Sequence, residues 1–250
     1  MTGPDAIRIL HDPRLDGPTN MARDEALMTR VGGGASPPTL RLYEWDPPTV
    51  SLGYFQHYAD YETLEPPAGG LAVVRRLTGG GAILHDIELT YALTLPSGHG
   101  LLRPGATALY GLVHDAAIAA LRGLGIDPAR CGRTDDSGAA KGPFFCFARR
   151  HAEDVLLGAD KLAGSAQRRT RDAVLQHGSI VLGNRFTQHP TATIPVPFEQ
   201  SMRVLRSQFP AHLSQSAGVS LAPGAWTPDE LDAAAALCPK YAGAPWTRRR

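Results

Sequence analysis

The stretch Arg75-Arg76-Leu77-Thr78-Gly79-Gly80-Gly81-Ala82-Ile83-Leu84-His85-Asp86 constrains the fold more strongly than any other part of the chain. Its three glycines stand between two apolar runs, 71–74 and 82–84. Glycine loses the most backbone entropy on ordering and packs no side chain, so the triplet indicates a turn and not a strand. A bare turn also lets a ligand press against backbone amide groups. Arginines before the turn and His-Asp after it predict a site for an anionic or carbonyl-bearing ligand.

Composition places the chain among ordinary globular proteins. Its 250 residues suffice for one large core or two small ones, and 43% are hydrophobic while 20% are charged. A net charge of +1 gives no support for nucleic-acid or membrane partners. The sequence shows no apolar run near the roughly 20 residues of a spanning helix and no secretory signal pattern.

The three cysteines are Cys131, Cys146 and Cys238. They cannot all pair, and their spacing is not that of a metal site. We therefore expect a reducing, cytoplasmic setting and no bound metal.

Periodicity along the chain predicts strands on both sides of the glycine turn, and helices before and after this group of strands. A second glycine triplet, 32–34, is interpreted as a helix stop. Residues 127–143 are rich in Gly, Asp, Arg and Ser, which predicts a mobile loop. We expect one α+β domain over residues 1–250, with a core at about 19–210, a C-terminal helical extension and tail at 211–250, and disorder at 248–250. Strands are expected at 40–45, 50–52, 71–74, 82–84, 89–95, 144–147, 154–157, 161–164 and 173–182, and helices at 19–30, 57–64, 106–121, 198–209 and 228–237.

Several familiar catalytic motifs are absent from the sequence. The glycine triplet is not followed by Lys-Ser/Thr, as in a P-loop, and it lacks the G-x-G-x-x-G spacing of a dinucleotide site. There is no G-x-S-x-G elbow and no H-E-x-x-H.

A second chemical segment remains after these exclusions. Lys161 lies just before the small residues Gly164-Ser165-Ala166, where its ammonium could enter a cleft and donate to a carbonyl or phosphate. Cys146 stands between two phenylalanines, a setting typical of a core cysteine. If Lys161 lies close, however, the thiolate is favoured and Cys146 becomes a candidate nucleophile.

Five segments together resemble the catalytic domain shared by lipoate–protein ligases, octanoyltransferases and biotin–protein ligases. They follow one another in the family's order from about residue 19 to 182. The segments are Asn20-Met-Ala-x-Asp-Glu25, Tyr43-x-Trp45-x-x-Pro48-Thr-Val-Ser-Leu-Gly53-x-x-Gln56, Arg75-Arg76-x-Thr-Gly-Gly-Gly-Ala-x-x-His85-Asp86, Lys161-x-x-Gly-Ser-Ala-Gln167 and Gln176-His177-Gly-Ser179.

The resemblance implies a mainly antiparallel, mixed sheet flanked by helices, with an acyl pocket lined by the glycine turn. It implies that Lys161 polarises the acyl carbonyl. Family members move octanoate or lipoate onto a lysine of a lipoyl carrier domain, such as the glycine-cleavage H protein or a 2-oxoacid dehydrogenase acyltransferase subunit. The substrate-binding residues expected on this basis are Arg75, Arg76, Thr78, Gly79, Gly80, Gly81, His85, Gly164, Ser165, Ala166, Gln167 and His177.

The family's branches differ in how they activate the acyl group. A transferase takes octanoate from octanoyl-acyl carrier protein through an enzyme cysteine and needs no cofactor, whereas a ligase forms an acyl-adenylate with ATP and Mg²⁺. Cys146 precedes Lys161 as the catalytic cysteine does in the octanoyltransferases that resemble lipoate ligases. The other octanoyltransferase branch uses a Thr-x-His-x-Cys segment after the lysine, which this chain lacks. An octanoyltransferase is therefore the preferred interpretation, with a lipoate ligase and a non-catalytic acyl-binding relative as alternatives.

Other roles stay open at the level of sequence. His85 either caps the turn or contacts the donor carbonyl, and His177 is expected to be structural, on a strand beside the pocket. One of Arg75 and Arg76 is expected to meet a phosphate, from a pantetheine arm or a nucleotide. For Cys131 and Cys238 a structural role is preferred.

Overall fold

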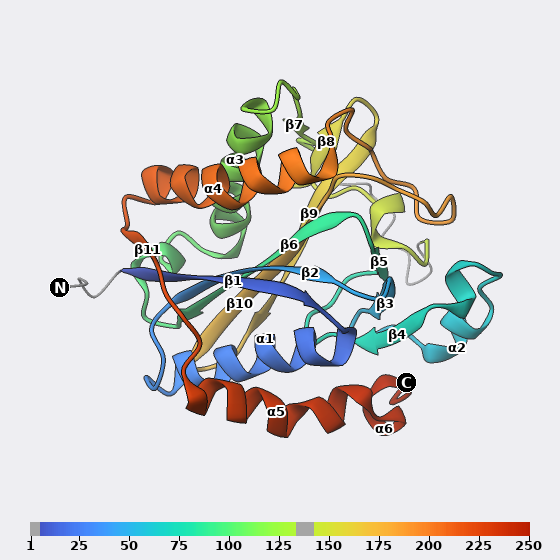
Figure 1. Ribbon diagram of the computed structural model, residues 1–250, viewed down its shortest axis with the longest axis horizontal. Helices are drawn as coiled ribbons and strands as arrows, with labels where there is room; N and C mark the ends of the chain where they lie inside the picture. The colour runs from blue at the N-terminus through green and yellow to red at the C-terminus, as the bar shows by residue number, and fades with distance from the viewer. Residues whose placement is uncertain (1–5, 134–142) are drawn as a thin grey trace.

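A large mixed sheet forms the centre of the computed structural model, which describes residues 6–133 and 143–250 (Figure 1). β1 runs parallel to β2 and β11, and the other neighbours are antiparallel. The sheet is therefore mixed and mainly antiparallel, as the family resemblance implied. The strand order is β11-β1-β2-β6-β10-β9-β8-β7. The strands are β1 (Ile7–Leu15), β2 (Thr39–Trp45), β6 (Glu88–Pro96), β7 (Ala129–Arg130), β8 (Val155–Leu157), β9 (Asp160–Arg169), β10 (Ala173–Val181) and β11 (Leu221–Pro223).

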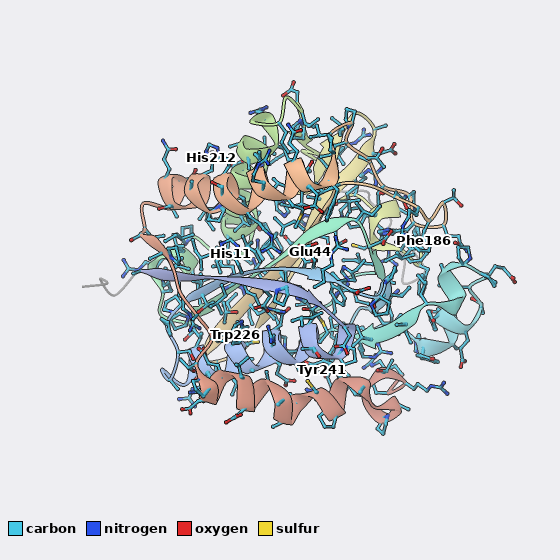
Figure 2. All side chains as sticks on the ribbon, in the orientation of Figure 1. His11, Glu44, Phe186, His212, Trp226 and Tyr241 are labelled. Carbon is cyan, nitrogen blue, oxygen red and sulfur yellow. The ribbon has the colours of Figure 1, made fainter. Side chains whose placement is uncertain are left out.

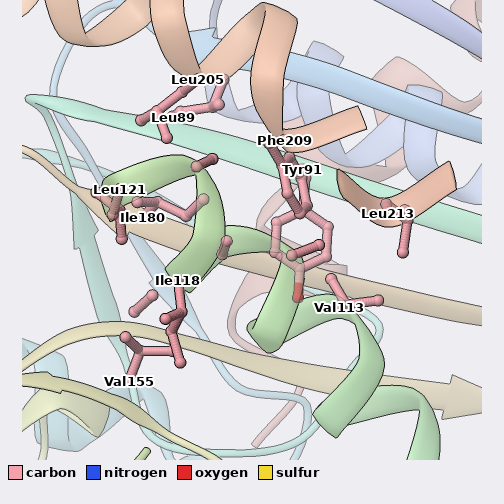
Figure 3. Packing of buried hydrophobic residues seen from close by; sticks show 14 of the residues in the cluster. Leu89, Tyr91, Val113, Ile118, Leu121, Val155, Ile180, Leu205, Phe209 and Leu213 are labelled. Atoms are coloured by element: carbon pink, nitrogen blue, oxygen red, sulfur yellow. The ribbon is translucent and has the colours of Figure 1, made fainter. Parts of the chain in front are cut away.

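Helices cover both faces of this sheet. On one face α3 (Ala106–Arg122) packs against α4 (Phe198–Ala217), and buried Leu89, Tyr91 and Ile180 face these helices (Figure 3). Tyr91 meets Phe209 of α4 edge-on, with ring centroids 5.4 Å apart. This cluster holds most of the buried aliphatic side chains, so it supplies most of the hydrophobic stabilisation.

The other face is covered by α1 (Gly17–Gly32), with α5 (Pro228–Ala242) packed outside it. Figure 2 labels Tyr241 on α5, and its hydroxyl donates to Glu25 of α1 at 2.8 Å. α1 begins after the capping side chain of Asp16 and ends at Gly33, followed by Gly34 at φ +72°. The second glycine triplet is thus a helix stop, as predicted.

A smaller sheet carries the glycine turn. Its order is β4-β3-β5, and the turn is the link from β4 (Ala72–Arg75) to β5 (Ile83–His85), which pair with opposite sides of β3 (Thr49–Leu52). Short segments complete the chain: α2 (Tyr58–Glu62), α6 (Ala244–Thr247), η1 (Ala68–Gly70), η2 (Gly100–Leu102) and η3 (Cys146–Ala148).

Local structure departs from the sequence predictions in several places. The strand expected at 144–147 is wrong: the segment makes a single bridge, Phe145 to Ala82, and then turns into η3. The disorder expected at 248–250 is also wrong, since these residues pack on aromatic rings. β1 and β11 were not expected. Of the loop expected at 127–143, two residues form β7, and 134–142 lie outside the described residues.

Among the described residues no helix has the length and apolarity needed to cross a membrane.

Candidate active site

The glycine turn presents unpaired amide groups. Gly80 has φ +89°, a left-handed conformation that glycine adopts without strain. The carbonyl oxygens of Gly79 and Gly81 accept hydrogen bonds from Arg76 Nη2 at 2.8 and 2.6 Å. Within the described residues, no protein acceptor receives the N–H groups of Gly79, Gly80 or Gly81. Neighbouring unpaired amides of this kind can hold a carbonyl oxygen or an oxyanion.

Arg76 is the buried support of this turn. Besides the two glycine carbonyls, its guanidinium donates to the Ser51 carbonyl at 2.8 Å and to Thr78 Oγ1 at 3.2 Å. Burial lowers its pKa to about 10. These contacts explain how the turn keeps its shape and direct the guanidinium into the protein.

Arg75 is equally buried but faces the C-terminal segment. It donates to the carbonyls of Thr247 and Gln56, each at 2.8 Å. Both guanidinium groups are thus buried and bound to backbone carbonyls, and the phosphate contact expected for one of them stays a prediction. Sequence reasoning could not find these acceptors, because Thr247 is 172 residues away along the chain.

Cys146 lies directly against the glycine turn. Its amide donates to Ala82 O at 2.7 Å, and a Cβ at Gly81 would come within 3.0 Å of that amide nitrogen. A Cβ at Gly80 would sit 4.0 Å from Cys146 Sγ. Phe145 and Phe147 are buried, whereas Cys146 itself is only partly buried. The cysteine is therefore not a fully enclosed core residue.

Lys161 faces Cys146 from β9. Its Nζ lies 3.8 Å from Cys146 Sγ and forms a buried ion pair with Asp154 at 2.7 Å. A Cβ at Gly164 would lie 2.7 Å from Nζ, so the lysine lies across a bare glycine. The structure thus brings together the two residues that the sequence analysis proposed as catalytic, with Asp154 as an added partner.

A bulge in β9 explains the direction of Lys161. Val155 pairs with Ala163, but the next residue, Leu156, pairs with Lys161, so one extra residue interrupts the alternation. As a result Lys161 shares a face with Gly164 and not with Ala163.

Ser165 and Gln167 lie on the opposite face of β9. Ser165 Oγ is 2.8 Å from His114 Nε2 of α3, and Gln167 donates to Ala106 O at 3.1 Å. In this structure the two side chains tie the sheet to α3, and the substrate contact expected for them stays a prediction. Ala166, between them, lines the pocket described below.

His177 connects α1 to the glycine turn. Its Nδ1 donates to Asp24 at 3.0 Å, and its Nε2 lies 2.6 Å from Thr78 Oγ1. Burial lowers the pKa of His177, so the ring is neutral and Nε2 accepts from Thr78. The structural role expected for His177 agrees with these contacts.

His85 makes a second relay of the same kind. Its Nδ1 donates to Glu88 and its Nε2 contacts Ser51 Oγ, both at 2.7 Å, while its ring stacks on Trp45 at 3.8 Å. Ser51 Oγ, like Thr78 Oγ1, accepts from Arg76. Both relays, each a carboxylate, a histidine and a hydroxyl, therefore meet at Arg76.

A narrow pocket lies between the main sheet, α1 and the smaller sheet. Its empty space, open mouth included, is about 290 Å³. Its walls include Met21, Trp45, Ile83, His85, Ala166 and His177. Cys146 packs against a cluster of Ile83, Phe147 and Val181, and Ile83 is also a wall of this pocket.

His189 is a site residue that the sequence analysis missed. Its ring lies 5.1 Å from that of Phe145 and 5.0 Å from that of Phe147, the two neighbours of Cys146. Its Nε2 is buried without a hydrogen-bond partner among the described residues, and burial lowers its pKa to about 3. No sequence signal marked it, since it follows no motif.

The antiparallel sheet, the bare glycine turn and the Cys146–Lys161 pair define a class, the catalytic domains that handle lipoyl-type acyl groups. Residues 16–209 match the family model described as the lipoyl protein ligase A/B catalytic domain. The chain belongs to this family.

Curated relatives narrow the assignment. Octanoyltransferase LipM of Kyrpidia tusciae is 35% identical over 97% of this chain and 98% of its own length. Octanoyltransferase LipM of Moorella thermoacetica is 36% identical with the same coverage. The prediction of an acyltransferase of the octanoyltransferase type is thereby confirmed.

Solved structures share the fold. A lipoate-protein ligase A bound with ATP superposes with a TM-score of 0.74 at 23% identity, over 99% of both chains. A bipartite lipoate protein ligase of Thermoplasma acidophilum superposes with a TM-score of 0.68 at 21% identity, over 96% of this chain and 95% of that one.

Proposed function

We propose that this enzyme transfers octanoate from octanoyl-acyl carrier protein to a lysine of a lipoyl carrier domain through a thioester on Cys146. The observation that carries the proposal is the 3.8 Å contact between Lys161 Nζ and Cys146 Sγ, beside an apolar pocket and unpaired amides. A nearby ammonium favours the thiolate, which is the reactive form of cysteine. The free state of Cys131, Cys146 and Cys238 fits a reducing, cytoplasmic setting.

In the first step the Cys146 sulfur attacks the carbonyl carbon of the donor thioester. The carbonyl oxygen becomes an oxyanion, which Lys161 and the amides of the glycine turn stabilise. Collapse breaks the bond to the carrier's sulfur, and the carrier thiol leaves with the proton that Cys146 gave up. The pocket holds the octanoyl chain away from water.

In the second step the neutral ε-amine of the acceptor lysine attacks the acyl-enzyme. The carbon–sulfur bond to Cys146 breaks as the amide bond forms, and the amine's proton returns to the sulfur. Candidate acceptors are the glycine-cleavage H protein and the lipoyl domains of 2-oxoacid dehydrogenase acyltransferase subunits.

No nucleotide enters either step, because the thioester is already activated. The competing ligase mechanism needs a phosphate site and Mg²⁺. Arg75 and Arg76, which directly precede the turn in the sequence, are both bound to backbone carbonyls. This use of the arginine pair favours the transferase over the ligase.

Intact-mass spectrometry tests the proposal. With octanoyl-acyl carrier protein and no ATP, the protein should gain one octanoyl group, and the Cys146→Ala variant should gain none. The variant Cys238→Ala serves as a control and should be acylated normally. Transfer that persists in Cys146→Ala, or that requires ATP, would contradict the proposal.

A further inference from the structure

Four arginines form a surface beside the glycine turn that the proposed chemistry does not use. Their guanidinium groups lie on aromatic rings that are exposed or partly buried. Three of the four follow α6, which packs beside β4 (Figure 1). Arg249 and Arg168 lie 4.4 and 5.2 Å from the centre of the same ring, Tyr54. We name this the arginine surface: Arg168, Arg248, Arg249 and Arg250, with Tyr54, Phe55 and Tyr58 beneath them.

The side chains of these four arginines lack ion-pair partners in the part of the chain that the structure describes. Arg75, buried beneath them, has its pKa lowered by burial and further by Arg249 and Arg250. The cations are therefore close enough to repel one another, and an external anion would relieve that repulsion.

The arginine surface adjoins the glycine turn. Phe55 is 59% exposed, the most of any large hydrophobic residue described. Its ring lies 3.8 Å from where a Cβ of Gly79 would be, and Tyr54 N donates to Thr78 O at 2.8 Å. A partner bound here would thus touch the backbone next to the unpaired amides.

We propose that the arginine surface docks the acyl carrier protein that delivers the octanoyl group, an inference that rests on the proposed function. A donor of this kind has an acidic protein body and carries the acyl group on an arm that begins at a phosphodiester, so both its parts are anionic. The acceptor presents a lysine, whose positive charge the arginines would repel. An exposed aromatic side chain inside a ring of arginines also has the composition of a protein-binding centre.

The direct test is binding of the holo acyl carrier protein, with no acyl group attached, to the native enzyme. The double variant Arg168→Glu/Arg249→Glu should weaken binding about tenfold, and raising the salt concentration should weaken native binding more than variant binding. Arg168→Gln/Arg249→Gln should lie between the two. Arg122→Glu is the matched control and should bind as the native protein does, because Arg122 is exposed at the end of α3, on the other side of the sheet.

A kinetic measurement tests whether the arginine substitutions act through docking of the carrier protein. Acylation of Cys146 by octanoyl-acyl carrier protein should fall about tenfold in the double variant, whereas acylation by octanoyl-pantetheine, which has neither phosphate nor protein body, should not change. Equal losses with both donors would overturn the docking proposal, as would absent or unaltered carrier binding, or a loss confined to the lipoyl domain. If the native enzyme acylates Cys146 with neither donor, the proposed function fails, and the binding result still decides the docking proposal.

Discussion

The ammonium of Lys161 lies over Gly164, so that a methyl group at position 164 would come within 2.7 Å of Nζ. Gly164→Ala should therefore displace the ammonium from Cys146 without removing any functional group. A shift of about 1 Å in a catalytic group can cost on the order of a hundredfold in rate, so acylation of Cys146 should fall by about that factor. Gly98→Ala is the control, because nothing lies within 4 Å of the added Cβ. If Cys146 in the Gly164→Ala variant is acylated at the wild-type rate, the position of Lys161 does not matter for acylation.

The ion pair between Lys161 and Asp154 predicts non-additive stability. Side-chain exposures are 3% and 6%, so Asp154→Asn leaves a buried ammonium without a counter-ion and should destabilise the protein by about 3 kcal/mol. Adding Lys161→Met removes that charge, so the double variant should unfold at higher urea concentration than Asp154→Asn alone while acylation stays lost. Simple addition of the two single-variant losses would argue against coupling.

The hydroxyl of Thr78 links Arg76 to His177, since it accepts a hydrogen bond from Arg76 and donates one to His177. Thr78→Val keeps the shape but leaves both buried partners without a hydrogen bond at this position, so the free energy of unfolding should drop by about 2 kcal/mol. Thr78→Ser keeps the hydroxyl and should lose less than half as much. The measurement is urea denaturation at pH 7, and equal losses in the two variants would assign the effect to packing.

His114 predicts a pH dependence of stability. Its Nδ1 donates to Glu153 O, its Nε2 faces Ser165, and burial lowers its pKa from 6.5 to about 4. The unfolded chain therefore takes up a proton between pH 6.5 and 4 while the folded protein does not. The contribution of neutral His114 to the free energy of unfolding is complete above pH 6.5. It declines as the pH falls from 6.5 to 4, by up to about 1.4 kcal/mol per pH unit.

His114→Gln isolates this effect from other titrating groups. The difference in unfolding free energy between native protein and variant should shrink on acidification from pH 6.5 to 4. A difference that stays constant with pH would mean that His114 is protonated in the folded state.

The sequence predicted those features that depend on neighbouring residues. The glycine turn, the helix stop at 32–34 and the strands around them follow from backbone propensity, and the structure contains them. Segment 144–147 was misassigned because an apolar run of four residues fits a strand or a buried turn equally well. Its conformation depends on close contact with Gly81, which periodicity does not contain.

The site residues also divide into those that the sequence predicted and those that only the packing reveals. Cys146 and Lys161 could be proposed from their motifs, but the partners that orient them could not. Asp24 lies in the first of the five segments and Asp154 lies outside all of them, and the contacts of both form only when the strands and α1 pack together. For Arg75 the acceptors come from a distant part of the chain, so its exposure could not be inferred locally.

The bulge in β9 gives the spacing of the lysine motif a geometric meaning. Residues after the bulge alternate regularly, so Gly164 lies against Lys161 and Ala166 lines the pocket, while Ser165 and Gln167 contact α3. One strand therefore serves chemistry on one side and anchoring on the other, and the extra residue before Ala163 puts the ammonium on the chemical side. Deleting a single residue there would keep every functional group in the sequence and turn the lysine toward α3. Whether Lys161 lies on the side of Cys146 or on the side of α3 thus depends on whether the number of residues between it and the regular part of β9 is odd or even.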